Sequence, residues 1–202
     1  MAQQLIVFAH VDEAEAFARA GIEHLITGVG KINATLELTR AILGRGVDRI
    51  GGVIVLGTAG AVSPDARLDT VYRVSAAMQH DYALPSPTIE LPGGESDSFP
   101  PAVIATGDVF VQSDAQRDEL AARGAMLVDM ESYAYARVCE QLGVPLRIFK
   151  TPSDFADDET TMDTWDEAVL SNSEQLLAFA REHLPELFVP VVPGHTSTEG
   201  SA

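Results

Sequence analysis

Residues 52–60 read Gly-Val-Ile-Val-Leu-Gly-Thr-Ala-Gly, an apolar run followed by a glycine-rich tetrapeptide. A short run without a polar side chain predicts a strand that is covered on both faces, as in the centre of an α/β sheet. The tetrapeptide 57–60 is interpreted as a turn at the end of this strand. A buried inner strand of this kind needs helices on both sides of the sheet.

Strand and helix patterns alternate on both sides of this run. Further strands are expected at residues 5–9, 24–27, 70–78, 103–106, 125–129 and 146–150. Helices are expected at residues 12–20, 32–43, 113–122, 131–142 and 164–183, and Ile32, Leu36, Thr39 and Leu43 fall on one stripe of the second. The alternation predicts an α/β fold with a largely parallel sheet, whose ligand sites lie at the carboxyl ends of the strands.

Length and composition favour one domain. The chain has 202 residues, of which 46% are hydrophobic, enough to bury one full core. Residues 84–101 hold five prolines and two adjacent glycines, which predicts a surface excursion. Residues 1–184 are expected to form the domain, and the prolines and the Ser, Thr and Gly cluster of residues 185–202 predict a disordered tail.

The charge of the chain restricts its partners. Thirteen basic against thirty acidic residues give a formal net charge of −17, which repels nucleic acids and anionic membranes. No segment is apolar enough to span a membrane and residues 1–10 lack the pattern of a secretion signal, so we expect a cytoplasmic location. The single Cys139 excludes an internal disulfide and is expected to be buried, and the five histidines show no metal-ligand spacing.

Polar residues and glycines follow the expected strands. They are Glu13 and residues 28–31, 57–60, 107–110, 129–131 and 153–154. Each of these alone is more often a turn or a helix cap than a ligand site. Residues 28–30 lack the third glycine of a dinucleotide-binding fingerprint, and the chain has no Gly-Lys-Ser/Thr phosphate loop, so no nucleotide cofactor is expected.

Taken in order, these segments resemble the nucleoside phosphorylase-I superfamily, especially its nucleosidase branch. The resemblance extends over residues 5–184. It rests on Ala9 with Glu13, Thr-Gly-Val-Gly-Lys-Ile-Asn-Ala at 27–34, Gly-Thr-Ala-Gly at 57–60, His-Asp at 80–81, Thr-Gly-Asp-Val-Phe at 106–110, Asp-Met-Glu-Ser at 129–132 and Ser-Asp-Phe-Ala-Asp at 153–157. The family implies a single-domain three-layer α/β sandwich around a mixed, partly barrel-like sheet, and a homodimer.

The resemblance also implies a role for each site residue. Asp154, next to Ser153, would protonate or hydrogen-bond the purine at N7, and Glu13 would activate the attacking water. Glu131 would hold the ribose hydroxyls with Met130 against the sugar. Phe110 would stack on the base, the main chain of Val111 would read its edge, and Thr58, Ala59 and Gly60 would line the floor near the nucleophile. No metal or other cofactor is implied.

The residues themselves are consistent with this chemistry. Breaking a C–N bond to ribose builds positive charge on the sugar and negative charge on the base, so a carboxylate must face the sugar and a proton donor the base. Asp154 therefore needs a raised pKa, which burial beside Phe149, Pro152 and Phe155 would supply. The expected activity is hydrolysis of a purine nucleoside, such as one that carries a 5′-methylthio or 5′-homocysteinyl group.

Three alternatives stay open at the level of sequence. The first is a phosphate-dependent phosphorylase, which would hold its anion with basic residues, whereas this chain offers Lys31 and Lys150 near the strand ends and Glu13 would repel phosphate. The second is a nucleoside-binding protein without turnover. The third is a shared fold with a different ligand. Trp165, Phe155 and Met162 are interpreted either as an apolar wall for a 5′ thioether or as packing for the last helix.

Overall fold

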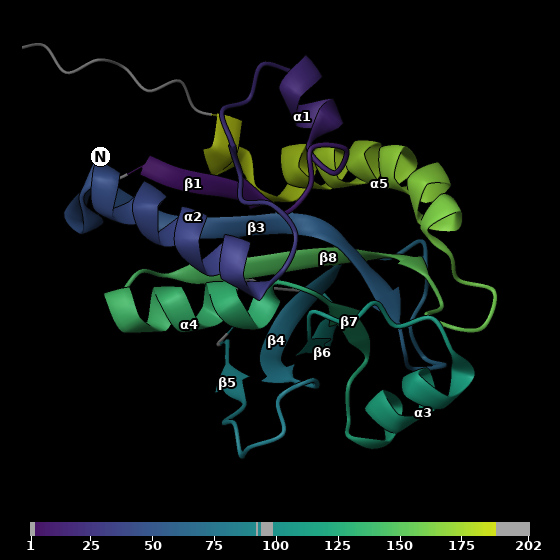
Figure 1. Ribbon diagram of the computed structural model, residues 1–202. Helices are drawn as coiled ribbons and strands as arrows, with labels where there is room; N and C mark the ends of the chain where they lie inside the picture. The colour runs from purple at the N-terminus through teal and green to yellow at the C-terminus, as the bar shows by residue number, and fades with distance from the viewer. Residues whose placement is uncertain (1–2, 92, 94–98, 189–202) are drawn as a thin grey trace, which may run out of the picture.

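The computed structural model describes residues 3–91, 93 and 99–188, and its centre is a mixed eight-stranded sheet (Figure 1). The strands are β1 (Gln3–Phe8), β2 (Leu25–Ile26), β3 (Ile50–Ala61), β4 (Tyr72–Gln79), β5 (Ile89–Glu90), β6 (Pro101–Thr106), β7 (Leu127–Asp129) and β8 (Leu146–Asp154). Their order is β2-β1-β3-β7-β6-β4-β5, and β8 pairs with both β3 and β4. Strands β3, β8, β4, β6 and β7 therefore close into a ring, which confirms the mixed, partly barrel-like sheet.

The sheet is buried on both faces near β3 because side chains alternate along its strands. Val53 and Val55 belong to one apolar cluster, together with side chains of α2 (Lys31–Arg45) and α4 (Ser132–Leu142). Ile54 and Leu56 belong to a second cluster with α1 (Glu15–Arg19) and α5 (Met162–His183). This arrangement is the three-layer sandwich, with one helix pair on each face of the sheet.

A third, smaller apolar cluster includes Leu120 of α3 (Asp114–Ala122), which covers the barrel next to β6 and β7. Two short 3₁₀ helices, Val47–Arg49 and Pro185–Phe188, precede β3 and end the described chain. Cys139 is buried in the cluster beneath α4, as expected, and burial raises the pKa of its thiol to about 12.

The tetrapeptide 57–60 forms no turn, contrary to the sequence-based expectation. Strand β3 continues through it to Ala61, and its pairing with β8 shifts register between Ala59 and Gly60. Its glycines allow other groups to approach the strand closely. A β-carbon on Gly57 would lie 2.9 Å from Glu13 Oε1 and 3.2 Å from Lys150 Nζ. The glycines therefore mark a crowded strand rather than a chain reversal.

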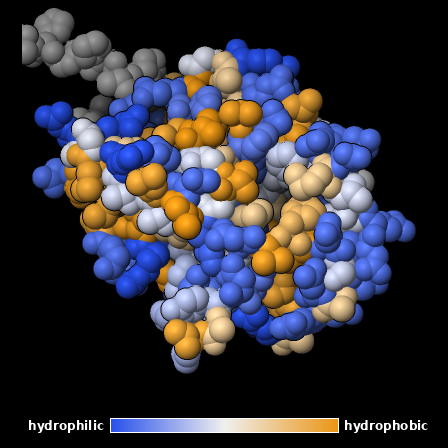
Figure 2. Space-filling model, in the orientation of Figure 1, coloured by the Kyte–Doolittle hydropathy of each residue, from blue (hydrophilic) through white to orange (hydrophobic). Residues whose placement is uncertain are grey.

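The stripe of Ile32, Leu36 and Leu43 does not face the sheet. Ala34, Leu38 and Ile42 are the residues of α2 that are buried, whereas Ile32 is 78%, Leu36 44% and Leu43 56% exposed. Figure 2 shows apolar surface over α2. The residues of the stripe are therefore exposed, and a different face of α2 packs against the core.

The C-terminal segment, which was expected to be a disordered tail from residue 185, begins with an ordered stretch in the structure. Residues 185–188 form a 3₁₀ helix whose Leu187 and Phe188 pack against the α1–α5 cluster, so the expected tail cannot begin before residue 189. Residues 189–202 lie outside the described residues, as do 92 and 94–98 of the proline-rich excursion. No helix in the described part of the chain is long and apolar enough to cross a bilayer.

Candidate active site

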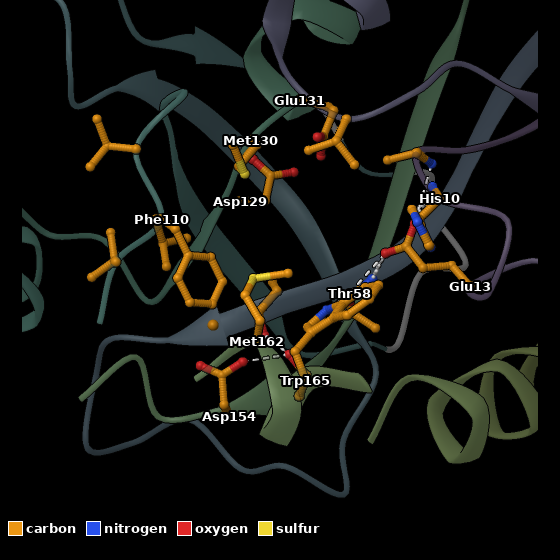
Figure 3. A pocket seen from close by; sticks show the side chains of 18 residues that line it. His10, Glu13, Thr58, Phe110, Asp129, Met130, Glu131, Asp154, Met162 and Trp165 are labelled. Atoms are coloured by element: carbon orange, nitrogen blue, oxygen red, sulfur yellow. Dashed lines mark hydrogen bonds between the residues drawn. The ribbon is translucent and has the colours of Figure 1, made fainter. Parts of the chain in front are cut away.

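A cavity of about 360 Å³ opens at the carboxyl ends of β1, β6, β7 and β8 (Figure 3). Strand β3 runs past it and the beginning of α5 covers one side. The lining residues are Ala9, His10, Glu13, Val29, Thr58, Ala59, Gly60, Val109, Phe110, Val111, Val128, Asp129, Met130, Glu131, Ser153, Asp154, Met162 and Trp165. All ten residues that the sequence singled out as site candidates are among them, although their individual roles stay predictions.

Glu13 is buried and both of its carboxylate oxygens accept hydrogen bonds. Oε1 accepts from the backbone N–H of Thr58 at 2.7 Å and from its hydroxyl at 2.8 Å. Oε2 accepts from the backbone N–H groups of Ala9 at 3.2 Å and His10 at 3.0 Å. Donors from β3 and from the loop after β1 thus fix the carboxylate at the edge of the cavity.

Glu131 lies at the N-terminus of α4, next to Met130. Its Oε1 accepts from the backbone N–H of Gly30 at 2.8 Å. Gly30 has a φ of 95°, a left-handed conformation that side chains disfavour, and this directs its N–H to Glu131. Burial raises the pKa of Glu131 to about 8, the charge of Asp129 adds to the rise, and Lys150 opposes it.

A buried ion pair lies beneath the carboxylates. Lys150 Nζ is 3.1 Å from Asp129 Oδ2, and both side chains are at most 3% exposed. Burial alone would lower the pKa of Lys150, but the negative charges of Asp129, Glu13 and Glu131 outweigh burial and raise it. One lysine thus lies near three carboxyl groups, and its positive charge opposes the negative charge that they can carry.

Asp129 is further held by hydroxyl groups. Its Oδ1 accepts from the Thr106 hydroxyl at 2.7 Å, and its Oδ2 accepts from the Ser132 hydroxyl at 2.6 Å. Because every oxygen of Asp129 is engaged by the protein, this residue organises the site rather than offering a free group to a ligand.

Asp154 lies across the cavity from Glu131, where β8 ends (Figure 3). Its Oδ2 accepts from the Ser153 hydroxyl at 2.6 Å, and its Oδ1 accepts from the Ala156 N–H at 2.8 Å and the Thr160 hydroxyl at 3.4 Å. Burial raises the pKa of Asp154, and these three donors oppose the rise. The raised pKa that the chemistry required is therefore present.

The remaining walls are apolar. Phe110 and Val111 come from the loop after β6, and Met130 from the loop after β7. Met162 and Trp165 come from the first turn of α5 and line the cavity, which favours the wall interpretation for these two residues. Phe155 is 47% exposed and is not among the lining residues, so it does not form that wall.

Sequence reasoning did not assign Asp129, Lys150 or His10 to the site. The signal for Asp129 and Lys150 was a charged residue at the end of an apolar strand, which is compatible with many structures. Lys31, the other lysine near the strand ends, bonds Asp81 at 2.6 Å and Gln79 at 3.2 Å. Among the described lining residues there is no lysine or arginine.

Comparison with known proteins places this geometry in a family. The family model described as the phosphorylase superfamily matches residues 98–185. An aminodeoxyfutalosine nucleosidase of Helicobacter pylori is 30% identical over 184 residues, which cover 79% of this chain and 78% of that protein. A 5′-methylthioadenosine/S-adenosylhomocysteine nucleosidase of Staphylococcus carnosus is 29% identical over 183 residues, with 75% and 78% covered.

Solved structures share the fold. A 5′-methylthioadenosine/S-adenosylhomocysteine nucleosidase of Helicobacter pylori, crystallised with butyl-thio-DADMe-Immucillin-A, matches with a TM-score of 0.80 at 22% identity and covers 92% of this chain and 99% of its own. A futalosine hydrolase of the same organism matches with a TM-score of 0.78 at 23% identity, covering 93% of this chain and 98% of its own. With its mixed barrel and its carboxylate-lined cavity, the chain belongs to the phosphorylase superfamily, in the branch of the nucleosidases.

Proposed function

We propose that this protein hydrolyses the N-glycosidic bond of a 5′-modified purine nucleoside. One observation carries the proposal: a partly buried carboxyl group with a raised pKa, Asp154, faces Glu131 and Glu13 across a cavity of about 360 Å³. A proton donor and hydrogen-bond acceptors thus lie on opposite sides of a space of the size that ligand sites have. The names of the relatives, which are nucleosidases of purine nucleosides, support this assignment.

The Asp154 side of the cavity suits the leaving base. The glycosidic electron pair moves into the purine as the C–N bond breaks, and Asp154 supplies a proton to a ring nitrogen at that moment. A raised pKa increases the share of Asp154 that carries this proton at a given pH. Phe110 offers a ring face on which the base can stack, and the main chain of Val111 lies beside it.

The Glu131 side suits the sugar. A carboxyl group can bond two neighbouring ribose hydroxyls, and Met130 lies beside it against the ring. In the free protein the pKa of Glu131 is about 8. Positive charge that develops on the sugar is stabilised by the oxygen atoms of Glu131, whose protonation state stays the same during bond cleavage.

Glu13 is the proposed base for the attacking water. Four donors hold its two oxygens in one orientation next to Thr58, Ala59 and Gly60, which form the floor of the cavity. A fixed carboxylate at this place can accept a proton from a water molecule that attacks the sugar carbon. The proton balance closes, because Asp154 loses one proton to the base and Glu13 gains one from water.

Water suits this cavity better than phosphate does. Four carboxyl groups and no lysine or arginine are found among its described lining residues. Both lysines near the strand ends are paired with carboxylates, Lys31 with Asp81 and Lys150 with Asp129. An incoming phosphate would therefore meet repulsion without a free cation to balance it.

The test is product analysis with purified protein and a panel of purine nucleosides. The panel contains 5′-methylthio, 5′-homocysteinyl, carboxylated futalosine-type and unmodified compounds, each with and without phosphate. We expect the reactions without added phosphate to release the free purine base and the free sugar. Asp154→Asn should lose this activity, whereas Asp158→Asn, an exposed carboxylate of the same loop, should retain it. Turnover only with phosphate would identify a phosphorylase, and no turnover with any compound would contradict the proposal.

We also propose a homodimer that uses the exposed face of α2. Ile32, Leu36 and Leu43 form an apolar stripe on that helix, and Val29 and Val109, 42% and 47% exposed, lie at the cavity. Exposed apolar side chains on one helix face are typical of a protein–protein interface. Sedimentation of the wild type and of Ile32→Glu tests this, because a charge in the interface should give a monomer.

A further inference from the structure

Trp165 connects α5 to the proposed base. It is the only tryptophan of the chain and lies in the first turn of α5. Its indole Nε1 donates to the Thr58 hydroxyl oxygen at 3.1 Å, and that hydroxyl donates to Glu13 Oε1 at 2.8 Å. Figure 3 shows the three side chains together at one edge of the cavity. A continuous hydrogen-bond chain therefore leads from the helix to the carboxylate.

This chain can have only one direction. An indole N–H is a donor and cannot accept, so Thr58 must accept from Trp165. A hydroxyl has a single proton, and the carboxylate of Glu13 accepts. The Trp165 contact thus occupies a lone pair of the Thr58 oxygen and commits the proton of Thr58 to Glu13.

Among the four donors to Glu13, the Thr58 hydroxyl is the only one that can turn away. The other three are backbone N–H groups of Ala9, His10 and Thr58, whose directions the main chain fixes. A hydroxyl rotates about its C–O bond and can bond any acceptor within reach, including water. Trp165 restricts this rotation, because a lone pair of the hydroxyl oxygen must stay directed at the indole N–H.

Trp165 also touches a second residue that holds Glu13. Its ring packs edge-to-face on the His10 imidazole, with 5.3 Å between ring centroids. The backbone N–H of His10 donates to Glu13 Oε2. One side chain therefore contacts residues that bond each of the two carboxylate oxygens.

We infer that Trp165 is a positioning residue for Glu13, and that it acts through the Thr58 hydroxyl. The inference rests on the proposed role of Glu13 as the base. A base must meet its water in a narrow range of directions, so a loosened carboxylate slows the chemical step more than it weakens substrate binding.

A sulfur analogue of tryptophan separates the N–H from the ring. Because the chain has a single tryptophan, growth on benzothienylalanine in a tryptophan auxotroph replaces position 165 alone. The analogue keeps the bicyclic ring and lacks the N–H. We expect kcat to fall about tenfold and KM to stay within about twofold, as for one lost hydrogen bond that acts in the transition state. Leu170→Gln, on the exposed side of the same helix, is the control for changes in α5.

A double-mutant cycle tests the route through Thr58. In Thr58→Val the hydroxyl is absent, so replacing the indole N–H should have no further effect on kcat. Additive losses in the doubly changed enzyme would overturn the inference, as would an unchanged kcat in the analogue enzyme or a loss confined to KM.

The indole resonance tests the contact without any activity. In ¹⁵N-labelled protein the single indole N–H gives one signal, and we expect Thr58→Val and Glu13→Gln both to shift it and to speed its exchange with solvent. If either change leaves the signal in place, the inference is wrong. Should the wild type cleave no nucleoside, the proposed function fails, and this signal still decides whether Trp165 is coupled to Glu13.

Discussion

The two sides of the cavity are built in different ways. At the base side, all three donors to Asp154 come from residues 153–160, one short stretch of chain. At the sugar side, the groups that hold Glu13, Glu131 and Asp129 come from the loop after β1, from β3, β6 and β8, and from the residue before α2. A single acid needs only local burial to raise its pKa, whereas three ionisable groups close together need compensation from the whole fold.

The largest effect expected from this difference is on activity at the sugar side. In Glu13→Gln the amide nitrogen cannot accept, so two of the four donors lose their partner and the base is gone. We expect kcat to fall by about 10²- to 10⁴-fold. Glu15→Gln, two residues further on and outside the cavity lining, serves as the control. Activity within about threefold of the wild type would exclude Glu13 as the base.

The buried lysine gives the largest expected effect on stability. Lys150→Met leaves Asp129 without its partner in the interior, and we expect the free energy of unfolding in urea to fall by about 3–5 kcal/mol at pH 7. Lys31→Met breaks a pair whose side chains are 19% and 17% exposed, and should cost at most about 1 kcal/mol. Equal losses in the two variants would mean that the sugar side does not depend on Lys150 for charge compensation.

The pH dependence of stability isolates Glu131. Its pKa is about 8 in the folded protein against an ordinary value of 4.5, so the folded state prefers the protonated form. This contribution is complete below pH 4.5 and is lost as the pH rises through 8. Relative to the wild type, Glu131→Gln should therefore gain stability between these pH values, by on the order of 3 kcal/mol in urea titrations. A difference that does not vary with pH would contradict the raised pKa.

The smallest effect is expected at the base side, because its donors are local and redundant. Ser153→Ala removes a donor to the ionised form of Asp154, which raises the pKa of Asp154 further. The alkaline limb of kcat/KM, where Asp154 must be protonated, should move up by about half a unit to one unit. Thr160→Val, which removes the longer 3.4 Å contact, should move it less. A shift to lower pH in either variant would contradict the assignment of Asp154 as the acid.

The same difference explains what the sequence could predict of the site. Segments 129–131 and 153–154 could be recognised because their candidate residues are adjacent in the sequence. All ten candidate residues line the same cavity in the structure. The Lys150–Asp129 ion pair joins residues that are 21 positions apart in the sequence (150 − 129), and the Trp165–Thr58 hydrogen bond joins residues that are 107 positions apart. Sequence spacing holds no information about such contacts, because tertiary packing alone brings their partners together.

For the fold, the type and order of the elements were predicted better than their ends and faces. Strand β3 was recognised by its apolar core, but glycines at 57 and 60 indicated a turn that the strand does not make. Position 57 requires glycine because the side chains of Glu13 and Lys150 approach the strand closely. A turn also favours glycine, so the sequence alone does not distinguish a close approach from a turn. The sequence did not indicate which face of α2 packs, because more than one face of this helix carries apolar residues.

The closed ring of β3, β8, β4, β6 and β7 leaves few places where a foreign strand could join the molecule. The sheet order ends in β2 and β5, which are two residues long each. A two-residue strand offers almost no template of unpaired backbone groups to another chain, and short edges are one means by which proteins avoid edge-to-edge aggregation. Within the part of the chain that the structure describes, the topology that assembles the cavity thus limits the open strand edges to the two ends of the sheet.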